Sequence, residues 1–450
     1  MPKIPYAVRV LLDGFSKEFS PSVWQMFLSL LTAAVMIRGR RTIWRLLRFS
    51  PRASTGHFSS YHRVFSHRRW SSYALAKRLA LAVVARFAQE GPLKLVGDDT
   101  VSQHRGEKVY GKGCHRDAVR SSHQHLVYRW GHKWVVLALR VQIPGATRTW
   151  ALPMLVALYR TPPESLKAGV VHKTPSELMR GLLAVWMRWF PQRKVVFAGD
   201  SSFATHELAG FASRHRRKRL ALVSKFPPTA VLHERPPQRK PGQKGRPRVV
   251  GKRLPSPQEV VASTGKRKRL TVKWYGGGTR RIEVVSGVGH WYRQGQGLVQ
   301  VRWVYVRDLT GSHRDEYFFS TDINMSIKRT VETFIGRWDI EVTFEEMREH
   351  LGLETTRGRC RQTVLRVEPC LFGLYTLIAY WFAHLPKKNR ETIHVAWVGK
   401  TSITFSDALV SVRYNVWEDY LFQRPNKSRP FEKLTTHMRN TILHALALAA

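Results

Sequence analysis

Residues 95–100 read LVGDDT, an apolar run that predicts a strand and closes on the carboxylates Asp98 and Asp99. A second run, VVFAGD at residues 195–200, has the same form and closes on Asp200. Carboxylates at the ends of neighbouring strands meet at one edge of a sheet. The two stretches therefore predict an α/β sheet with an acidic site at its edge.

Positive charge dominates the rest of the chain. Its 450 residues include 75 Lys and Arg against 31 Asp and Glu, a formal net charge of +44. Such a field attracts polyanions, of which DNA and RNA are the commonest. No charge-free apolar run reaches the ~18–20 residues that cross a bilayer, so we expect no membrane partner. Three scattered cysteines are too few for a disulfide framework, which fits an intracellular, reducing setting.

Changes in residue composition and in the spacing of apolar residues divide the chain into four predicted parts. Residues 1–90 have helical spacing and predict a helical domain. Residues 91–225 and 326–385 mix strands and helices and predict one α/β domain, with separate strands at 124–130 and 133–141. Residues 226–325 predict a basic linker followed by a β-rich insertion, and residues 386–450 a helical C-terminal region.

Basic segments at two places suggest contacts with DNA. Short basic helices joined by a turn, as in the first 90 residues, suit a DNA-binding unit, although an amphipathic domain with a solvated basic face explains them equally well. In the linker, Lys244, Arg246 and Arg248 resemble a hook that lays arginine into the minor groove. Gly-Arg-Pro turns are also common in basic linkers.

Acidic side chains in a DNA-binding protein suggest phosphodiester chemistry. Cleavage without a covalent enzyme intermediate requires an activated water or hydroxyl and neutralised charge on the leaving oxygen. Two Mg²⁺ or Mn²⁺ ions ~3.5–4 Å apart supply both, and carboxylates are their natural ligands. Because side chains alternate along a strand, Asp98 and Asp99 cannot both face such ions. A strand-end turn at Asp98 and Asp99, or an N-cap at Asp200, is the simpler role of each acid.

A third acid, Glu341, lies in a long predicted helix that begins near residue 327. Phe334, Arg337, Glu341 and Arg348 fall on one face of that helix, so two arginines flank the carboxylate. The arginines could grip phosphates beside the bond that is cut. An ordinary ion pair between Arg337 and Glu341 is the simpler explanation.

The spacing of these four residues resembles the signature of bacterial insertion-sequence transposases of the DDE type. That signature is Tyr, two residues, Arg, three residues, Glu, six residues and Lys. The DDT and AGD stretches resemble the first two acidic motifs of the group, and a β-rich insertion is another shared trait. The resemblance covers roughly residues 90–385. Phe334 in place of Tyr removes a hydroxyl, and Arg348 in place of Lys changes the shape of the base.

This resemblance implies an RNase H-like fold and two Mg²⁺ or Mn²⁺ ions. It implies that Asp99, which directly precedes the Thr, binds the ions with Asp200 and Glu341, and Asp98 is the fallback for Asp99. The implied activity is cleavage of transposon ends and strand transfer into target DNA. The implied partners are double-stranded terminal repeats, target DNA and a second copy of the chain.

In relatives with a β-rich insertion, aromatic residues of the insertion can hold a flipped base. Here Trp274, Trp291 and Trp303 are the candidates, although packing is the simpler role of each.

Two other functions compete with this one. A tyrosine recombinase would use His290 and Arg293 with Tyr305 or Tyr317, but glycines around the first two predict a turn between strands. A non-catalytic basic protein that coats nucleic acid would explain the composition. It would not explain the acidic runs or the spacing of Arg337, Glu341 and Arg348.

Overall fold

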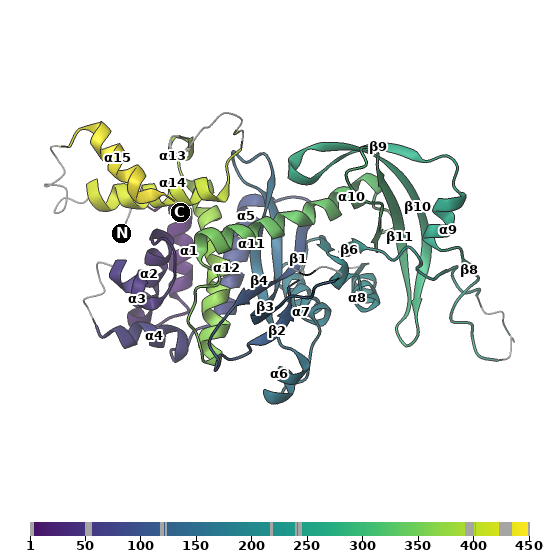
Figure 1. The fold of residues 1–450 in the computed structure, drawn as a ribbon, viewed down its shortest axis with the longest axis horizontal. Coiled ribbons are helices and arrows are strands. Elements are labelled where there is room, and N and C mark those ends of the chain that lie inside the picture. The colour runs from purple at the N-terminus through teal and green to yellow at the C-terminus, as the bar shows by residue number, and fades with distance from the viewer. Residues whose placement is uncertain are drawn as a thin grey trace.

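The computed structural model describes residues 4–49, 56–117, 121, 124–216, 219–238, 241, 245–391, 400, 402–422 and 434–448. Its centre is a 12-stranded mixed sheet with helices packed around it (Figure 1). Within the described ranges, no helix is both long enough and apolar enough to cross a membrane.

Five strands form the core of an RNase H-like sheet in the order β4-β3-β1-β5-β6. Strands β1, β5 and β6 are parallel, whereas β3 is antiparallel to both β1 and β4. The short β2 adds to the outer edge of β3. These strands are β1 (Leu93–Gln103), β2 (Gly113–Arg116), β3 (Tyr128–Gln142), β4 (Thr149–Tyr159), β5 (Val195–Gly199) and β6 (Leu220–Lys225). The predicted mixed α/β, RNase H-like class is confirmed.

Two predicted strand boundaries are wrong, and one close approach explains both. β1 does not stop before the two aspartates but continues to Gln103, and β3 runs unbroken through Gly131 and His132. Register pairs Gln103 with Gly131. A Cβ on Gly131 would lie only 2.1 Å from the Ser102 carbonyl oxygen, so glycine here brings the two backbones together instead of forming a turn.

The β-rich insertion extends the same sheet beyond β6. Strand β12 pairs with β6, and β11, β10 and β9 follow in antiparallel order. Its elements are β7 (Leu232–His233), β8 (Arg253–Leu254), α9 (Pro257–Ser263), β9 (Lys268–Lys273), η2 (Tyr275–Gly277), β10 (Thr279–Arg293), β11 (Gly297–Asp308) and β12 (Glu316–Ser320). The turn predicted around His290 is wrong, because β10 continues to Arg293.

Helices cover both faces of β1. Gly97 shares a face with Asp99, and a Cβ on Gly97 would meet Met179 of α7 (Pro175–Trp189) at 2.5 Å. The opposite face, with Thr100, receives a hydrogen bond from Arg348 of α11 (Asp339–Leu351). The helix predicted from residue 327 is divided into α10 (Ile327–Ile335), the single 3₁₀ turn η3 (Gly336–Trp338) and α11.

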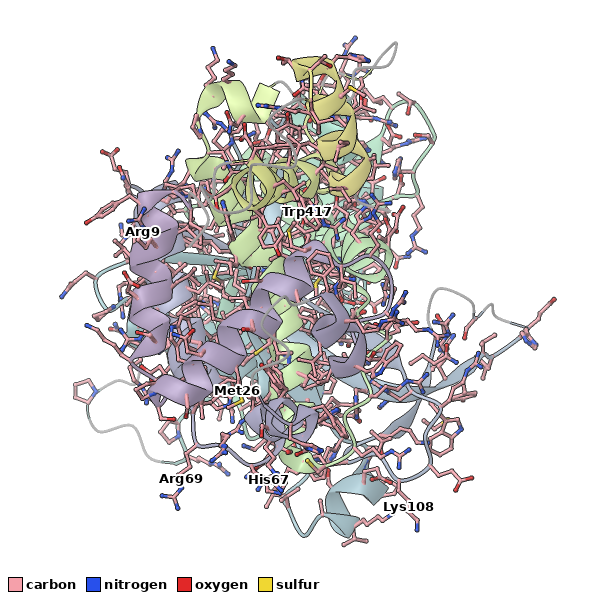
Figure 2. The ribbon with its side chains drawn as sticks, turned by 90° about the vertical axis from the view of Figure 1, so that its left-hand side faces the viewer. Arg9, Met26, His67, Arg69, Lys108 and Trp417 are labelled. Atoms are coloured by element: carbon pink, nitrogen blue, oxygen red, sulfur yellow. The ribbon has the colours of Figure 1, made fainter. Side chains whose placement is uncertain are left out.

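The helices of residues 6–66 and 387–447 gather at one end of the molecule, opposite the insertion strands (Figure 1). Arg9 and Arg69 project from the surface of this end, whereas Lys108 lies in the connection between β1 and β2 (Figure 2). The hydrophobic core of this end is continuous with that of the sheet, since α5 and α12 both pack on β4. The other helices of the protein are α1 (Tyr6–Ser16), α2 (Pro21–Met36), α3 (Ile43–Phe49), α4 (Phe58–Ser66), α5 (Ser72–Phe87), α6 (Pro162–Lys167), η1 (Ser201–Phe203), α8 (His206–Arg216), α12 (Arg361–His384), α13 (Lys387–Glu391), α14 (Phe405–Phe422) and α15 (Thr436–Ala447). The division of the chain into domains stays a prediction.

Candidate active site

Two parallel strands bring the predicted aspartates together. Gly97 of β1 is in register with Gly199 of β5, so Asp98 and Asp200 follow paired positions on neighbouring strands. Such strands lie about 4.8 Å apart. The predicted convergence of the two acidic runs thus follows from the sheet, although Asp98 and Asp99 lie inside β1 and not at its end.

Arg337 joins Asp98 to the predicted third acid. Its Nη1 donates to Asp98 Oδ2 at 2.8 Å, and its Nη2 lies 2.6 Å from Glu341 Oε1. The arginine is only 11% exposed, while the Glu341 side chain is 31% exposed. Glu341 occupies the first turn of α11, where the helix dipole favours a carboxylate. The ion pair expected between Arg337 and Glu341 is therefore present, and it extends to Asp98.

Asp99 points to the other face of β1. Its Oδ2 lies 2.9 Å from Nζ of Lys133 on β3. The sequence did not allow Lys133 to be identified, because nothing in it shows which residue of β3 lies diagonally across from Asp99. Asp98 consequently shares a face with Glu341, and Asp99 does not.

Asp200 adopts the simple role that its sequence context suggests. It caps η1, accepting hydrogen bonds from the Ser202 backbone N–H at 3.0 Å and from the Ser202 hydroxyl at 2.6 Å. The cap fixes one oxygen of the carboxylate. It does not exclude a second role, since a carboxylate has about four acceptor positions.

The acids repel one another in a buried setting. Burial raises the pKa of Asp98 to about 8, and the charges of Asp200 and Asp99 add to the rise while Arg337 opposes it. Burial likewise raises the pKa of Asp99, against the effect of Lys133. Arg337 Nε is buried without a hydrogen-bond partner. The raised pKa values of the two aspartates reflect a setting that opposes their negative charge, a condition that a bound cation would relieve.

Side-chain positions in this cluster reflect pairing with Arg337 rather than with a metal ion. Within the described part of the chain, one group of three candidate metal ligands has all its ligand atoms within 4.8 Å, and it is His104, His132 and Glu368 instead of the acidic triad. The Arg337 guanidinium lies between Asp98 and Glu341, where it holds their oxygens apart. The donor set of oxygens suits Mg²⁺ or Mn²⁺, provided that Arg337 moves aside.

A close contact positions the start of α11. The guanidinium of Arg140 passes over Gly336, where a Cβ would lie 2.0 Å from its Nη1. Arg140 Nε then donates to Asp339 Oδ2 at 2.6 Å, and Thr149 donates to the same oxygen at 2.5 Å. Glycine at residue 336 leaves room for this guanidinium, which ties the turn before Arg337 to β3 and β4.

The predicted DNA contacts have different environments. Phe334 is 2% exposed and stacks on Phe318, so we correct the predicted contact and assign its ring to the core. The ring still adjoins the site, since the Arg337 guanidinium lies over it, 5.7 Å from the ring centroid. Arg348 remains half-exposed, 3.3 Å from Glu354. Arg246 and Arg248 are exposed, and Lys244 lies outside the described residues.

The tryptophans of the insertion are mainly packing residues. Trp303 is 3% exposed and Trp274 is 9% exposed, so neither offers a free face to a base. Trp291 is half-buried between Phe226 and Phe319. An exposed aromatic that the sequence reasoning missed is Trp338, 43% exposed and next to Arg337 in the chain.

The geometry opposes a tyrosine nucleophile. Tyr305 is 3% exposed and donates a hydrogen bond to Asp315 at 2.5 Å. Burial together with Asp315 raises its pKa to about 12, which disfavours the phenolate. His290 and Arg293 lie within β10, where His290 contacts the His233 carbonyl oxygen at 3.3 Å.

Comparison with protein families identifies the group to which the chain belongs. A family model described as DDE superfamily endonuclease matches residues 15–281, which is more than half of the chain. The chain belongs to the DDE superfamily of endonucleases. The matched part of this DDE endonuclease contains Asp98, Asp99 and Asp200 and ends before Glu341. The assignment of Glu341 as the third acid therefore depends on its sequence spacing and its geometry.

Comparison with solved structures finds a similar transposase for this DDE endonuclease. That protein is piggyBac transposase in a synaptic complex with hairpin DNA, studied by cryo-electron microscopy. The two share 10% sequence identity with a TM-score of 0.39, over 98% of this chain and 82% of that chain. A search of curated proteins finds no match.

Proposed function

We propose that this DDE endonuclease is a transposase of the bacterial insertion-sequence type, which cuts transposon ends and transfers them to target DNA. The observation that carries the proposal is that Asp98 and Glu341 share one arginine, while Asp200 follows the position paired with that before Asp98, on an RNase H-like sheet. Asp98 replaces Asp99 in the proposed ligand set, because Asp98 faces Glu341 and Asp99 is paired with Lys133.

Carboxylate oxygens of Asp98, Asp200 and Glu341 would hold two Mg²⁺ or Mn²⁺ ions. When bound, the ions activate the attacking water or 3′-hydroxyl and neutralise charge on the leaving oxygen. The protein contributes position: β1 and β5 fix the two aspartates, and α11 presents Glu341 from its first turn. Arg337, once released from the two acids, presents its guanidinium donors to a phosphate oxygen beside the reaction centre.

A basic pocket beside Arg348 supports DNA as the substrate. The pocket measures about 600 Å³, and its lining includes Arg40, Arg105, Arg357 and Arg359, all exposed. Glu354, the partner of Arg348, lines the same pocket. Four arginines in one concavity suit the phosphate backbone.

We further propose that two copies pair around the DNA ends, as the resemblance implies, and that the protein acts at the nucleoid.

A cleavage assay tests this function. The substrate is a plasmid that carries the coding sequence with its native flanking DNA, incubated with the protein and Mg²⁺ or Mn²⁺. We expect metal-dependent nicks in the flanking DNA, lost in Asp200→Asn and kept in Glu349→Gln, whose side chain is 67% exposed on the same helix as Glu341. Cleavage without metal, or cleavage retained in Asp200→Asn, would reject the proposal. The rival recombinase predicts instead that Tyr305→Phe or Tyr317→Phe abolishes activity.

A further inference from the structure

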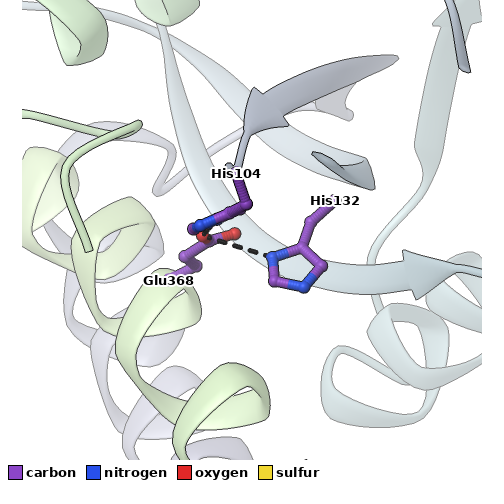
Figure 3. Close-up of side chains that lie close together, drawn as sticks. All are labelled: His104, His132 and Glu368. Carbon is purple, nitrogen blue, oxygen red and sulfur yellow. Dashed lines mark hydrogen bonds and ion pairs between the residues drawn. The ribbon is translucent and has the colours of Figure 1, made fainter. Parts of the chain in front are cut away.

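A second polar cluster lies beyond the acidic site, where β1 ends. It consists of His104, which follows β1, His132 of β3 and Glu368 of α12 (Figure 3). Their side chains are 7%, 1% and 2% exposed. His132 is in register with Ser102, so both histidines approach the helix from paired strands. The cluster is therefore enclosed in the protein and lies apart from the proposed reaction centre.

More polar atoms lie close to Glu368 Oε1 than this oxygen can accept hydrogen bonds from. His104 Nε2 lies 2.5 Å away, Thr356 Oγ1 3.1 Å, Ser102 Oγ 3.2 Å and His132 Nδ1 3.4 Å. A carboxylate oxygen accepts about two hydrogen bonds. The other oxygen, Oε2, already accepts one from the Trp134 indole N–H. Four groups thus converge on an atom with room for about two.

The tautomer of His132 adds a second conflict, because it places two hydrogen-bond acceptors next to each other. Its Nε2 lies 2.9 Å from the Tyr110 carbonyl oxygen, which can only accept, so Nε2 carries a proton and donates. In a neutral ring, Nδ1 then presents a lone pair to Glu368 Oε1, which is also an acceptor. A positive centre between the two atoms removes the conflict. Histidines that bind metal ions commonly donate their other N–H to a backbone carbonyl in this way.

We propose that His104 Nε2, His132 Nδ1 and Glu368 Oε1 bind a structural Zn²⁺ ion, with the Ser102 hydroxyl or a water as fourth ligand. Two imidazoles and one carboxylate form a donor set that zinc accepts. In a tetrahedron with bonds of about 2.0–2.2 Å, ligand atoms lie about 3.3–3.6 Å apart. The 3.4 Å between His132 Nδ1 and Glu368 Oε1 has that value, and His104 moves outward to complete the site.

The proposed ion has a clear structural consequence. Its ligands connect β1, which carries Asp98, to β3 and to α12. Ser102 also contacts the Leu353 carbonyl oxygen, just after α11, at 3.2 Å. Zinc at this point would hold the end of the strand of the acidic site against α12 and against the segment that follows α11, the helix of Glu341. This role is independent of the ions proposed for catalysis, which have only oxygen ligands.

Metal analysis of the full-length protein tests the site. The protein is produced with added zinc, purified without chelators and examined by elemental analysis and zinc X-ray absorption. We expect about one zinc ion per chain, bound by two imidazoles and oxygen without sulfur. Asp200→Asn should keep this zinc, whereas His132→Asn and Glu368→Gln should lose it. His115→Asn is the matched control, since His115 is also buried, at 5% exposure, but lies outside the cluster.

Three results would overturn the proposal. The first is folded wild-type protein that contains only background zinc and gives no tetrahedral absorption bands with Co²⁺. The cluster would then be a hydrogen-bonded ion pair with a doubly protonated His132. The second is zinc that survives both His132→Asn and Glu368→Gln. The third is an absorption spectrum with sulfur ligands or without imidazole, a readout on wild-type protein that holds even if the variants do not fold.

Discussion

Two buried charged clusters lie along strand β1 and just beyond its end, and their acids differ in how the surroundings affect the carboxylate charge. Around Asp98, mutual repulsion and burial raise the pKa of the acid to about 8, and Arg337 is shared between two carboxylates. Around Glu368, burial opposes ionisation, yet neighbouring donors, His104 among them, lower the pKa of the acid to about 2. An acid whose pKa is raised by several units is typical of a reaction centre, and an ionised acid surrounded by polar groups is typical of a structural support.

The largest expected effect belongs to the acidic cluster. Glu341→Gln should reduce DNA cleavage by about 10³-fold or more, because a charged ligand of the proposed ions is lost, while DNA affinity and melting temperature stay near wild type. Rates come from a gel-based nicking assay and affinities from fluorescence anisotropy. Glu349→Gln is the matched control on the same helix. Equal losses in both variants would show that the helix, and not the position of Glu341, is what matters.

The next effect concerns stability at the histidine cluster. Glu368→Ala should lower the free energy of unfolding by about 3–5 kcal/mol, because it leaves several buried donors without their acceptor. Denaturant unfolding measures the loss. His115→Ala serves as the control for removing a nearby buried side chain. A change below about 1 kcal/mol would contradict the view that this cluster supports the fold.

A smaller effect of opposite sign is expected at Asp98. Without added divalent metal, Asp98→Asn should stabilise the protein by about 1–2 kcal/mol near pH 8. The folded pKa of about 8 exceeds the ordinary value of 3.8, so the stability contributed by the protonated acid is lost as pH rises through that interval. The advantage of Asn should therefore disappear near pH 4. Melting temperatures between pH 4 and 8 measure it.

Asp99→Asn provides the comparison on the other face of β1. It removes a carboxylate paired with Lys133, so it should give less stabilisation than Asp98→Asn and should retain cleavage that Asp98→Asn abolishes. The opposite ranking in the cleavage assay would restore Asp99 as the metal ligand implied by the sequence resemblance.

The smallest effect is expected in the linker, far from both clusters in the sequence. Replacing both Arg246 and Arg248 with Ala should weaken DNA binding and lower the slope of log affinity against log salt by about 1 for each lost phosphate contact. Arg235→Ala, at another exposed position of the same basic segment, is the control. An unchanged slope would contradict the predicted contact of Arg246 and Arg248 with DNA.

The sequence allowed the two acidic strands and the RNase H-like class to be predicted, because LVGDDT and VVFAGD combine apolar strands with acids that such a sheet brings together. It could not show that β1 continues past Asp99. Polar residues such as Thr100 and Ser102 look like loop, and only pairing with β3 through Gly131 makes them strand. Contacts set by the fold were equally hidden, such as Arg337 with Asp98 and His104 with Glu368, 264 residues apart.

The central claim is that Asp98, Asp200 and Glu341 hold the catalytic ions. Its most direct test is a crystal of the protein with DNA, soaked in Mn²⁺ and measured at the manganese absorption edge. We predict anomalous peaks among these three carboxylates, with Arg337 displaced towards a phosphate. Peaks on the Asp99 and Lys133 face, or no peaks with Arg337 still bridging Asp98 and Glu341, would contradict the claim.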